Sequence, residues 1–295
     1  MSDSTSTSTS TSTSTSTSTS TSTSTSTSTS TSTSTTPTPH ISVTDLAIGW
    51  GDRLLIEYAT FAVKRASCFA ILGGSGCGKS SLLRHLIGLE PPKAGTIHID
   101  GLGDPLITQG APGFGVMFQS GALFGSMNLL DNCLLPLQAW TQLTTREQIE
   151  LARAKLELVG LGPFTNLLPG EISGGMKKRA GIARAMVLEP DLLFFDEPSA
   201  GLDPISAVEL DDLIRSLIDD LGITVVLVTH ELPSIYRIVD ECIVLDKDAR
   251  GIVANGQPAD LRDHCTLPFV HHFFNRTSPS SASASDSAKT NGAPP

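Results

Sequence analysis

Residues 73–80, with the sequence Gly-Gly-Ser-Gly-Cys-Gly-Lys-Ser, form the chemically most informative segment of the chain. They fit the pattern G-x-x-x-x-G-K-[ST], in which glycines let backbone N–H groups surround a β-phosphate. In this pattern the Lys79 ammonium reaches the β- and γ-phosphate oxygens, and the Ser80 hydroxyl binds Mg²⁺. The predicted phosphate-binding residues are Gly73, Gly74, Ser75, Gly76, Cys77, Gly78, Lys79, Ser80 and Ser81.

A second segment, residues 192–197, is an apolar run that ends in two carboxylates, Leu-Leu-Phe-Phe-Asp-Glu. A continuous apolar run predicts a buried strand, which places Asp196 at the strand's C-terminal end, within reach of the metal. Glu197 follows directly and is the candidate general base that polarises an attacking water. With residues 73–80, this segment makes nucleotide hydrolysis the leading hypothesis.

A third segment lies between the other two, at residues 172–176, Ile-Ser-Gly-Gly-Met. A Ser-Gly-Gly sequence that opens a helix presents free N–H groups to an anion. Ser173, Gly174 and Gly175 are therefore candidate phosphate contacts.

The order of these three segments resembles the ATP-binding subunits of ABC transporters, from about residue 41 to about residue 276. A closer likeness lies in residues 118–124 (FQSGALF) and 174–180 (GGMKKRA). Both look like the ATPase of Mla-type phospholipid transporters, which work with MCE-domain lipid-binding proteins. The resemblance implies ATP and Mg²⁺ as cofactors and a permease as a membrane partner.

The resemblance also implies roles for further residues. Trp50 would stack on adenine, although the family more often has tyrosine there. Gln119 would sense Mg²⁺ and the water and link to the membrane subunit, and His230 would contact the γ-phosphate. Asp203 would meet the phosphate-binding loop (P-loop) of the opposite subunit across a dimer. In this family the 173–175 amides cannot reach the nucleotide of their own chain, so the resemblance implies that two copies clamp two ATP molecules. The predicted catalytic residues are Lys79, Gln119, Glu197 and His230, and the predicted metal ligands are Ser80, Gln119 and Asp196.

Two residues depart from the family pattern. Met176 replaces the glutamine usual at the end of the third segment, and Ala200 replaces a serine in residues 200–203. Neither change removes a group that performs chemistry, and the methionine is shared with the lipid-transport branch. The expectation of ATPase activity therefore stands.

Composition divides the 295 residues into a core and two tails. Residues 4–36 are almost pure Ser-Thr alternation with no apolar group to bury, so 1–39 is predicted to be a disordered tail. The Ser-, Ala- and Pro-rich residues 277–295 are predicted to be a second one. Residues 40–276 are predicted to form one ATP-binding domain. The resemblance implies a helical insertion in it, at about 126–180, where the membrane subunit would dock.

Charge and hydropathy narrow the class of protein. A net charge of −10 argues against a nucleic-acid partner. The basic cluster 177–179, with Arg184, is expected to line the helix near a partner subunit's nucleotide or to face solvent. No run approaches the roughly 20 apolar residues of a membrane span, and the N-terminus lacks a signal-peptide pattern. Five scattered cysteines fit reduced thiols. Any membrane role must therefore come through a partner, and the resemblance implies peripheral attachment, through the permease, to the cytoplasmic face of the inner membrane.

Hydrophobic periodicity predicts strands that alternate with helices. The fold class is α/β: a P-loop NTPase of ABC type, with a mostly parallel sheet, antiparallel edge strands and the helical insertion. Gly73, Asp196 and His230 should emerge together at the C-terminal ends of parallel strands, where such sheets bind ligands. Strands are predicted at 40–48, 60–63, 69–72, 95–101, 114–118, 192–196 and 223–228, and helices at 79–87, 128–137, 145–159, 176–188, 204–221, 259–263 and 267–274.

Two other functions stay open at this stage. One is an ABC ATPase for a small solute, and the other is a soluble ABC ATPase of iron–sulfur assembly, DNA repair or translation. The second lacks the coiled coils, zinc modules or paired cassettes usual for such proteins. The resemblance further implies that the C-terminal end contacts the sister ATPase and a STAS-type regulator, but packing on the chain's own core explains Phe269, Phe273 and Phe274 equally well.

Overall fold

The computed structural model describes residues 38–51, 53–105 and 110–275. Apart from residues 38 and 39, the two predicted tails lie outside these ranges. The strands are β1 (Ile41–Trp50), β2 (Arg53–Val63), β3 (Cys68–Gly73), β4 (Ala94–Ile99), β5 (Gly115–Met117), β6 (Leu192–Asp196), β7 (Thr224–Val228), β8 (Glu241–Asp246) and β9 (Gly251–Gly256). The helices are α1 (Lys79–Leu86), α2 (Leu129–Trp140), α3 (Thr145–Leu158), η1 (Gly162–Phe164), η2 (Pro169–Glu171), α4 (Gly174–Met186), α5 (Pro204–Leu221), α6 (Leu232–Ile238), α7 (Pro258–His264) and α8 (Pro268–Asn275).

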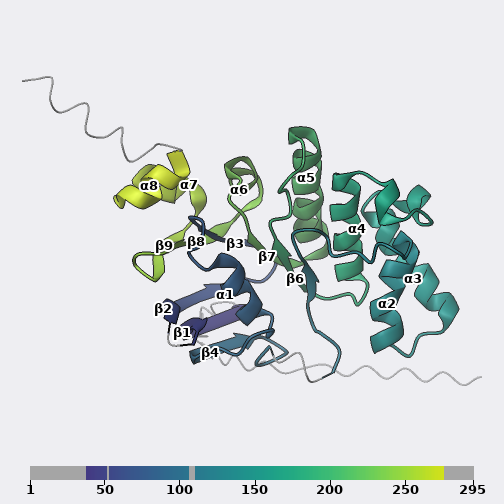
Figure 1. Ribbon diagram of the computed structural model, residues 1–295, viewed down its shortest axis with the longest axis horizontal. Coiled ribbons are helices and arrows are strands. Elements are labelled where there is room, and N and C mark those ends of the chain that lie inside the picture. Colours follow the sequence, from purple (N-terminus) through teal and green to yellow (C-terminus); the bar gives the residue numbers. More distant parts are fainter. Residues whose placement is uncertain (1–37, 52, 106–109, 276–295) are drawn as a thin grey trace, which may run out of the picture. The chain divides into compact units, whose positions relative to one another are not determined.

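The strands form two sheets in the described part of the chain (Figure 1). The larger has the order β5-β6-β7-β3-β8-β9, in which the first five strands are parallel and β9 pairs antiparallel with β8. The smaller, β2-β1-β4, is antiparallel. A mostly parallel sheet with antiparallel strands and flanking helices confirms the predicted fold class.

The alternation of side chains along the central strands creates two hydrophobic cores. In β3, Phe69 and Ile71 face one core, whereas Cys68, Ala70 and Leu72 face the other. The first core lies between the two sheets and includes Leu82, Leu83 and Leu86 of α1; the second is covered by helices α2 to α8. Because both faces are buried, these strands are continuous apolar runs, as is usual for parallel sheets.

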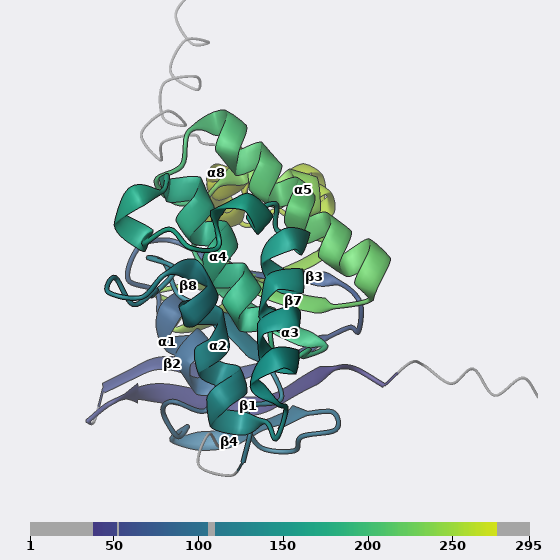
Figure 2. The same cartoon turned by 90° about the vertical axis from the view of Figure 1, so that its right-hand side faces the viewer.

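Helices α2, α3 and α4 lie side by side over one end of the large sheet (Figure 2). Asn128 caps α2 through a hydrogen bond from the Asp131 N–H, and Thr144 and Glu147 form a capping box at the start of α3. These helices fill most of the range predicted as an insertion, 126–180. The boundaries of that insertion and of the domain stay predictions.

No bounds were predicted from the sequence for strands β8 and β9 or for helices η1, η2 and α6. Strand β2 begins at Arg53 instead of residue 60, and it passes through a positive φ of 54° at Tyr58. That break explains why the period-2 pattern indicated only the second half of the strand. Within the described residues, no helix is both long enough and apolar enough to cross a bilayer.

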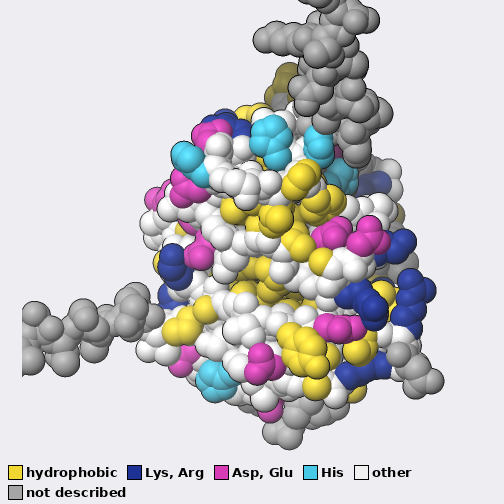
Figure 3. Space-filling model, turned by 90° about the vertical axis from the view of Figure 1, so that its left-hand side faces the viewer, with side chains coloured by type: hydrophobic (Ala, Val, Ile, Leu, Met, Phe, Trp, Pro, Cys, Tyr) yellow, Lys and Arg dark blue, Asp and Glu magenta, His cyan; other side chains and the backbone are white. Residues whose placement is uncertain are grey.

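The C-terminal helix α8 packs on the chain's own core. Val270 and Phe274 are buried there, and Phe273 packs against the same cluster. Leu267 and Phe269, by contrast, are exposed by 44% and 37%. Figure 3 shows hydrophobic side chains gathered on the face of the molecule that carries α7, α8 and β9. Core packing therefore accounts for two of the three aromatic residues singled out from the sequence.

Candidate functional site

The candidate site lies where β3, β6 and β7 end. These strands are neighbours in the order β6-β7-β3, so Gly73, Asp196 and the residues after Val228 meet at one edge of the sheet. A cavity of about 370 Å³ opens there. Its lining includes ten of the predicted site residues, together with Leu55: Trp50, Ser75, Gly76, Gly78, Lys79, Ser80, Ser81, Gln119, Asp196 and Glu197.

The loop between β3 and α1 has a positive φ, which glycine adopts readily, at Gly73, Gly76 and Gly78. Gly73 has a φ of 143°, and a Cβ there would lie 2.3 Å from the Leu245 carbonyl oxygen. Gly78 precedes α1 with a φ of 103°. Lys79 Nζ donates to the carbonyl oxygens of Gly73 and Gly74, each at 3.0 Å. These two hydrogen bonds hold the Lys79 ammonium over the loop, where it could bind an anion.

Two predicted metal ligands touch across the site. Ser80 Oγ donates to Asp196 Oδ1 at 3.3 Å. Burial raises the pKa of the Asp196 carboxyl, although the hydrogen bond from Ser80 lowers it. Gln119 lines the same cavity. A hydroxyl, a carboxylate and an amide are the oxygen ligands that Mg²⁺ prefers, and so the three residues fit that ion.

Glu197 and His230 form a close pair beside the metal candidates. His230 Nδ1 lies 2.8 Å from Glu197 Oε1, while Glu197 Oε2 is buried without a hydrogen-bond partner. Glu197 has a φ of 51°, and its N–H donates to the Val228 carbonyl at 2.9 Å. A strained backbone and a buried oxygen without a hydrogen bond both lower the stability of the fold, and the cost of the oxygen is removed when a donor such as a water binds it.

Other predicted residues lie outside the cavity. Ser173 caps α4 by accepting from the Met176 N–H, and Asp203 caps α5 by accepting from the N–H groups of Ile205 and Ser206. Gly174 is exposed, whereas Gly175 is buried. None of Ser173, Gly174, Gly175 and Asp203 lines the cavity of this chain.

Three residues of the phosphate-binding segment, Gly73, Gly74 and Cys77, also do not line the cavity. Cys77 is 2% exposed, and burial raises the pKa of its thiol. An inert cysteine within a loop that binds through its backbone agrees with these facts.

Sequence reasoning missed Lys178. It was expected to face solvent or a partner's nucleotide, but its side chain is only 6% exposed. Nζ donates to the main-chain carbonyls of Gln119 and Glu197. Burial lowers the Lys178 pKa, and the carboxylates of Glu197 and Asp196 raise it. The helical spacing of buried Gly175, Lys178, Ile182 and Met186 is the signal that could have identified it.

Arg184 was grouped with the same basic residues, and it too turns inward. Its guanidinium donates to the carbonyl of Ala122 at 2.6 Å and to that of Gly121 at 3.1 Å. Arg184 therefore fixes the loop that follows β5. The expectation of a solvent-facing side chain was therefore wrong for Lys178, whereas Arg184 is half-buried, and the alternative of a place near a partner subunit's nucleotide stays a prediction.

A glycine-rich loop that opens a helix after β3 faces a carboxylate pair at the end of β6, two strands away in the parallel sheet, and this arrangement defines a P-loop nucleotide-binding domain. The family model described as "ABC transporter" matches residues 56–200. The intermembrane phospholipid transport system ATP-binding protein MlaF of Escherichia coli K12 is 40% identical over 228 residues, which cover 75% of this chain and 84% of MlaF. The chain therefore belongs to the ABC transporter family as one of its ATP-binding proteins, an ABC ATPase.

A second relative is the probable ribonucleotide transport ATP-binding protein mkl of Mycobacterium tuberculosis H37Rv. It is 43% identical over 242 residues, which cover 80% of this chain but 66% of the relative's own length. Among solved structures, cbiO1 of Clostridium perfringens, part of the ABC transporter complex cbiONQ, matches with a TM-score of 0.68 at 27% identity, covering 75% of this chain and 90% of cbiO1. A bacterial ABC transporter cassette with a dimeric structure matches with a TM-score of 0.64 at 25% identity, covering 74% and 98%.

Proposed function

We propose that this chain hydrolyses ATP on the cytoplasmic face of the inner membrane and energises phospholipid transport through a separate permease. The observation that carries the hydrolytic part is the Glu197–His230 pair beside the phosphate-binding loop. The phospholipid part rests on the 40% identity to MlaF over 84% of that protein.

The residues of the cavity have separate tasks in binding ATP with Mg²⁺. Lys79 and the loop amides would neutralise the triphosphate, and Trp50, 55% exposed at the rim of the cavity, would stack on adenine. Ser80, Asp196 and Gln119 would hold Mg²⁺. When bound, Mg²⁺ neutralises charge on the β- and γ-phosphate oxygens.

Glu197 is the proposed general base. Its free Oε2 would accept a hydrogen bond from the attacking water, and its Oε1 is already held by His230. His230 therefore orients the carboxylate, and its exposed ring can reach toward the γ-phosphate. Positioning of the water and stabilisation of charge are the main contributions that an enzyme makes to phosphoryl transfer.

A second copy of the chain is the proposed partner at the nucleotide. Ser173, Gly174 and Asp203 are exposed and do not line this chain's own cavity. In an ATP-sandwich dimer, the α4 N-terminus of one copy would face the nucleotide bound by the other. Each site would then need both chains.

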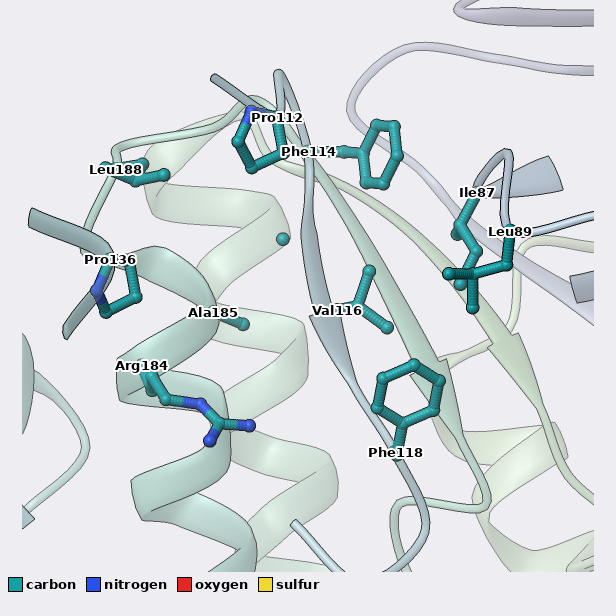
Figure 4. A pocket seen from close by; sticks show the side chains of 11 residues that line it. Ile87, Leu89, Pro112, Phe114, Val116, Phe118, Pro136, Arg184, Ala185 and Leu188 are labelled. Carbon is teal, nitrogen blue, oxygen red and sulfur yellow. The ribbon is translucent and has the colours of Figure 1, made fainter. Parts of the chain in front are cut away.

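A groove of about 270 Å³ is the proposed seat for a cytoplasmic helix of the permease. In Figure 4, Arg184 and Ala185 project from α4 on one side, Ile87 and Leu89 lie on the other, and Phe118 lies between them. The lining is mostly apolar, and Phe118 directly precedes Gln119 of the nucleotide cavity. A helix bound in this groove would contact Phe118, and a shift of Phe118 would move the adjacent Gln119 in the nucleotide cavity. MCE-type and STAS-type proteins are proposed as further partners on family resemblance alone.

A small solute is the second candidate cargo, because the mycobacterial relative is named for ribonucleotide transport. The two candidates predict different partners. We would purify a tagged Glu197→Gln variant, which should trap the ATP-bound dimer, and identify co-purifying proteins and lipids by mass spectrometry. A permease, an MCE protein and phospholipid would support the proposal. A solute permease would favour the second candidate, and the absence of any membrane protein would refute both.

A further inference from the structure

We propose that Lys178 is a positioning residue that ties helix α4 to the two loops carrying Gln119 and Glu197. The kinetic part of this inference rests on the proposed function, whereas the structural part does not. The inference concerns a residue that contacts main-chain atoms and not the nucleotide cavity itself.

The contacts of Lys178 are unusual for a lysine in a helix. Its side chain is 6% exposed, and Nζ donates to the Glu197 carbonyl at 2.9 Å and to the Gln119 carbonyl. A buried ammonium is tolerated only where donors and charge are compensated, and lysine has three donors and no acceptor. Two carbonyl oxygens from separate loops, 59 and 19 residues away in the sequence, accept from two of these three donors. The carboxylates of Glu197 and Asp196 offset part of the charge.

The contact fixes Glu197 from its C-terminal side. The Glu197 N–H is held by the Val228 carbonyl at the end of β7, and the Glu197 carbonyl accepts from Lys178 at 2.9 Å and, at a longer 3.3 Å, from the Ala200 N–H. With both polar main-chain atoms bonded, the residue keeps its left-handed φ of 51°, and its carboxylate stays 2.8 Å from His230. Loss of the Lys178 contact should let this backbone relax toward an unstrained conformation.

The same ammonium restrains Gln119. The Gln119 side chain is exposed, so the main-chain bond to Lys178 is one of the anchors of its loop. Helix α4 begins directly after Ser173 of the third segment. A displacement of α4 against the sheet would therefore move the loops of Gln119 and Glu197 together.

The test compares Lys178→Met with Lys178→Arg, which keeps a charged donor, and with Lys177→Met as a matched control. Lys177 is half-buried and bonds to neither carbonyl. In the nucleotide-free full chain, hydrogen exchange should rise about fivefold or more in residues 118–122 and 197–201 of Lys178→Met, and not in the other two variants. Kinetically, kcat should fall about 10- to 100-fold while ATP affinity changes less than about twofold.

The outcomes separate the inference from the proposed function. Unchanged exchange in both segments, or an equal loss of kcat and ATP affinity without rescue by Lys178→Arg, would overturn the positioning role. If the wild-type chain does not hydrolyse ATP, the proposed function fails, and the exchange data still decide the role of Lys178. Should Lys178→Met not fold, Lys178→Leu, which also lacks a hydrogen-bond donor, takes its place with the same criteria.

Discussion

His230 Nδ1 lies 2.8 Å from Glu197 Oε1, and this bond leaves Oε2 of the same carboxylate buried and without a partner. One oxygen of the Glu197 carboxylate is therefore held by His230, and the other is free to accept a hydrogen bond. The free oxygen is the atom best placed to accept a proton from a water, because its counterpart is fixed in direction.

Replacing Glu197 with glutamine should abolish the proposed general base while keeping the shape of the side chain. We expect kcat for ATP hydrolysis to fall by about 10²- to 10⁴-fold with little change in ATP affinity. Steady-state ATPase assays and equilibrium binding of a fluorescent ATP analogue measure the two quantities. Hydrolysis retained within about threefold would exclude Glu197 as the general base.

Gly73→Ala should destabilise the fold as well as the loop. The new methyl group would lie 2.3 Å from the Leu245 carbonyl at a φ of 143°, so we expect a loss of about 2–4 kcal/mol in the free energy of unfolding. Gly222→Ala is the control, because its φ is 67° and no atom lies within 4 Å. Gly222→Ala should lower the free energy of unfolding by about 1–2 kcal/mol, as measured by urea unfolding. Equal losses in the two variants would contradict the predicted clash.

Asp211 should make stability depend on pH. Burial raises its pKa to about 6, against the lowering effects of the Ser234 hydrogen bond and the Arg237 charge, while Asp212 raises it further. The folded chain holds this proton up to about pH 6, but the unfolded chain releases it near pH 4. Raising the pH between these values therefore favours unfolding. Between about pH 4.5 and about pH 7.5, wild type should lose about 2 kcal/mol relative to Asp211→Asn.

Urea unfolding of both proteins across that pH range checks the sign. Asp211 is 2% exposed, so solvent screening should not cancel the effect. A stability difference that stays constant with pH would show that the carboxyl titrates alike in the folded and unfolded chains.

The two phenylalanines of α8 should behave differently. Phe274→Ala removes a ring that is 3% exposed and should cost about 3–5 kcal/mol, whereas Phe269→Ala, with a ring 37% exposed, should cost less than about 1 kcal/mol. Thermal or urea unfolding distinguishes them. If Phe269→Ala leaves stability intact but weakens association with a second copy, the C-terminal segment contributes to the dimer interface. A stability loss equal to that of Phe274→Ala would mean that both rings pack only in this chain's core.

Elements with a strong local signal could be predicted from the sequence. The bounds of β6 and α5 agree with the predicted 192–196 and 204–221, because an apolar run ending in Asp196 and a helix capped by Asp203 carry their own boundaries. Strands β8 and β9 were missed. The apolar run from Cys242 to Leu245 resembled its neighbours, but no motif drew attention to it.

Ten residues that line the candidate cavity could be predicted from the sequence, but the geometry of the site could not. Motif spacing identified Lys79, Asp196 and Glu197, yet the sheet order that brings β3, β6 and β7 together is a tertiary property. Lys178 was missed because a run of basic residues suggests solvent exposure. Its helical spacing could indicate burial, but the two loops that its ammonium contacts follow from the packing of α4.

The most direct test of the central claim is lipid transfer by the reconstituted complex. The chain would be co-purified with its permease, placed in phospholipid vesicles and supplied with ATP and Mg²⁺, and movement of a fluorescent phospholipid would be followed for wild type and for Glu197→Gln. We predict ATP-dependent transfer with wild type and none with the variant. Transfer that proceeds equally with both, or ATP hydrolysis by wild type without any phospholipid movement, would contradict the proposed role.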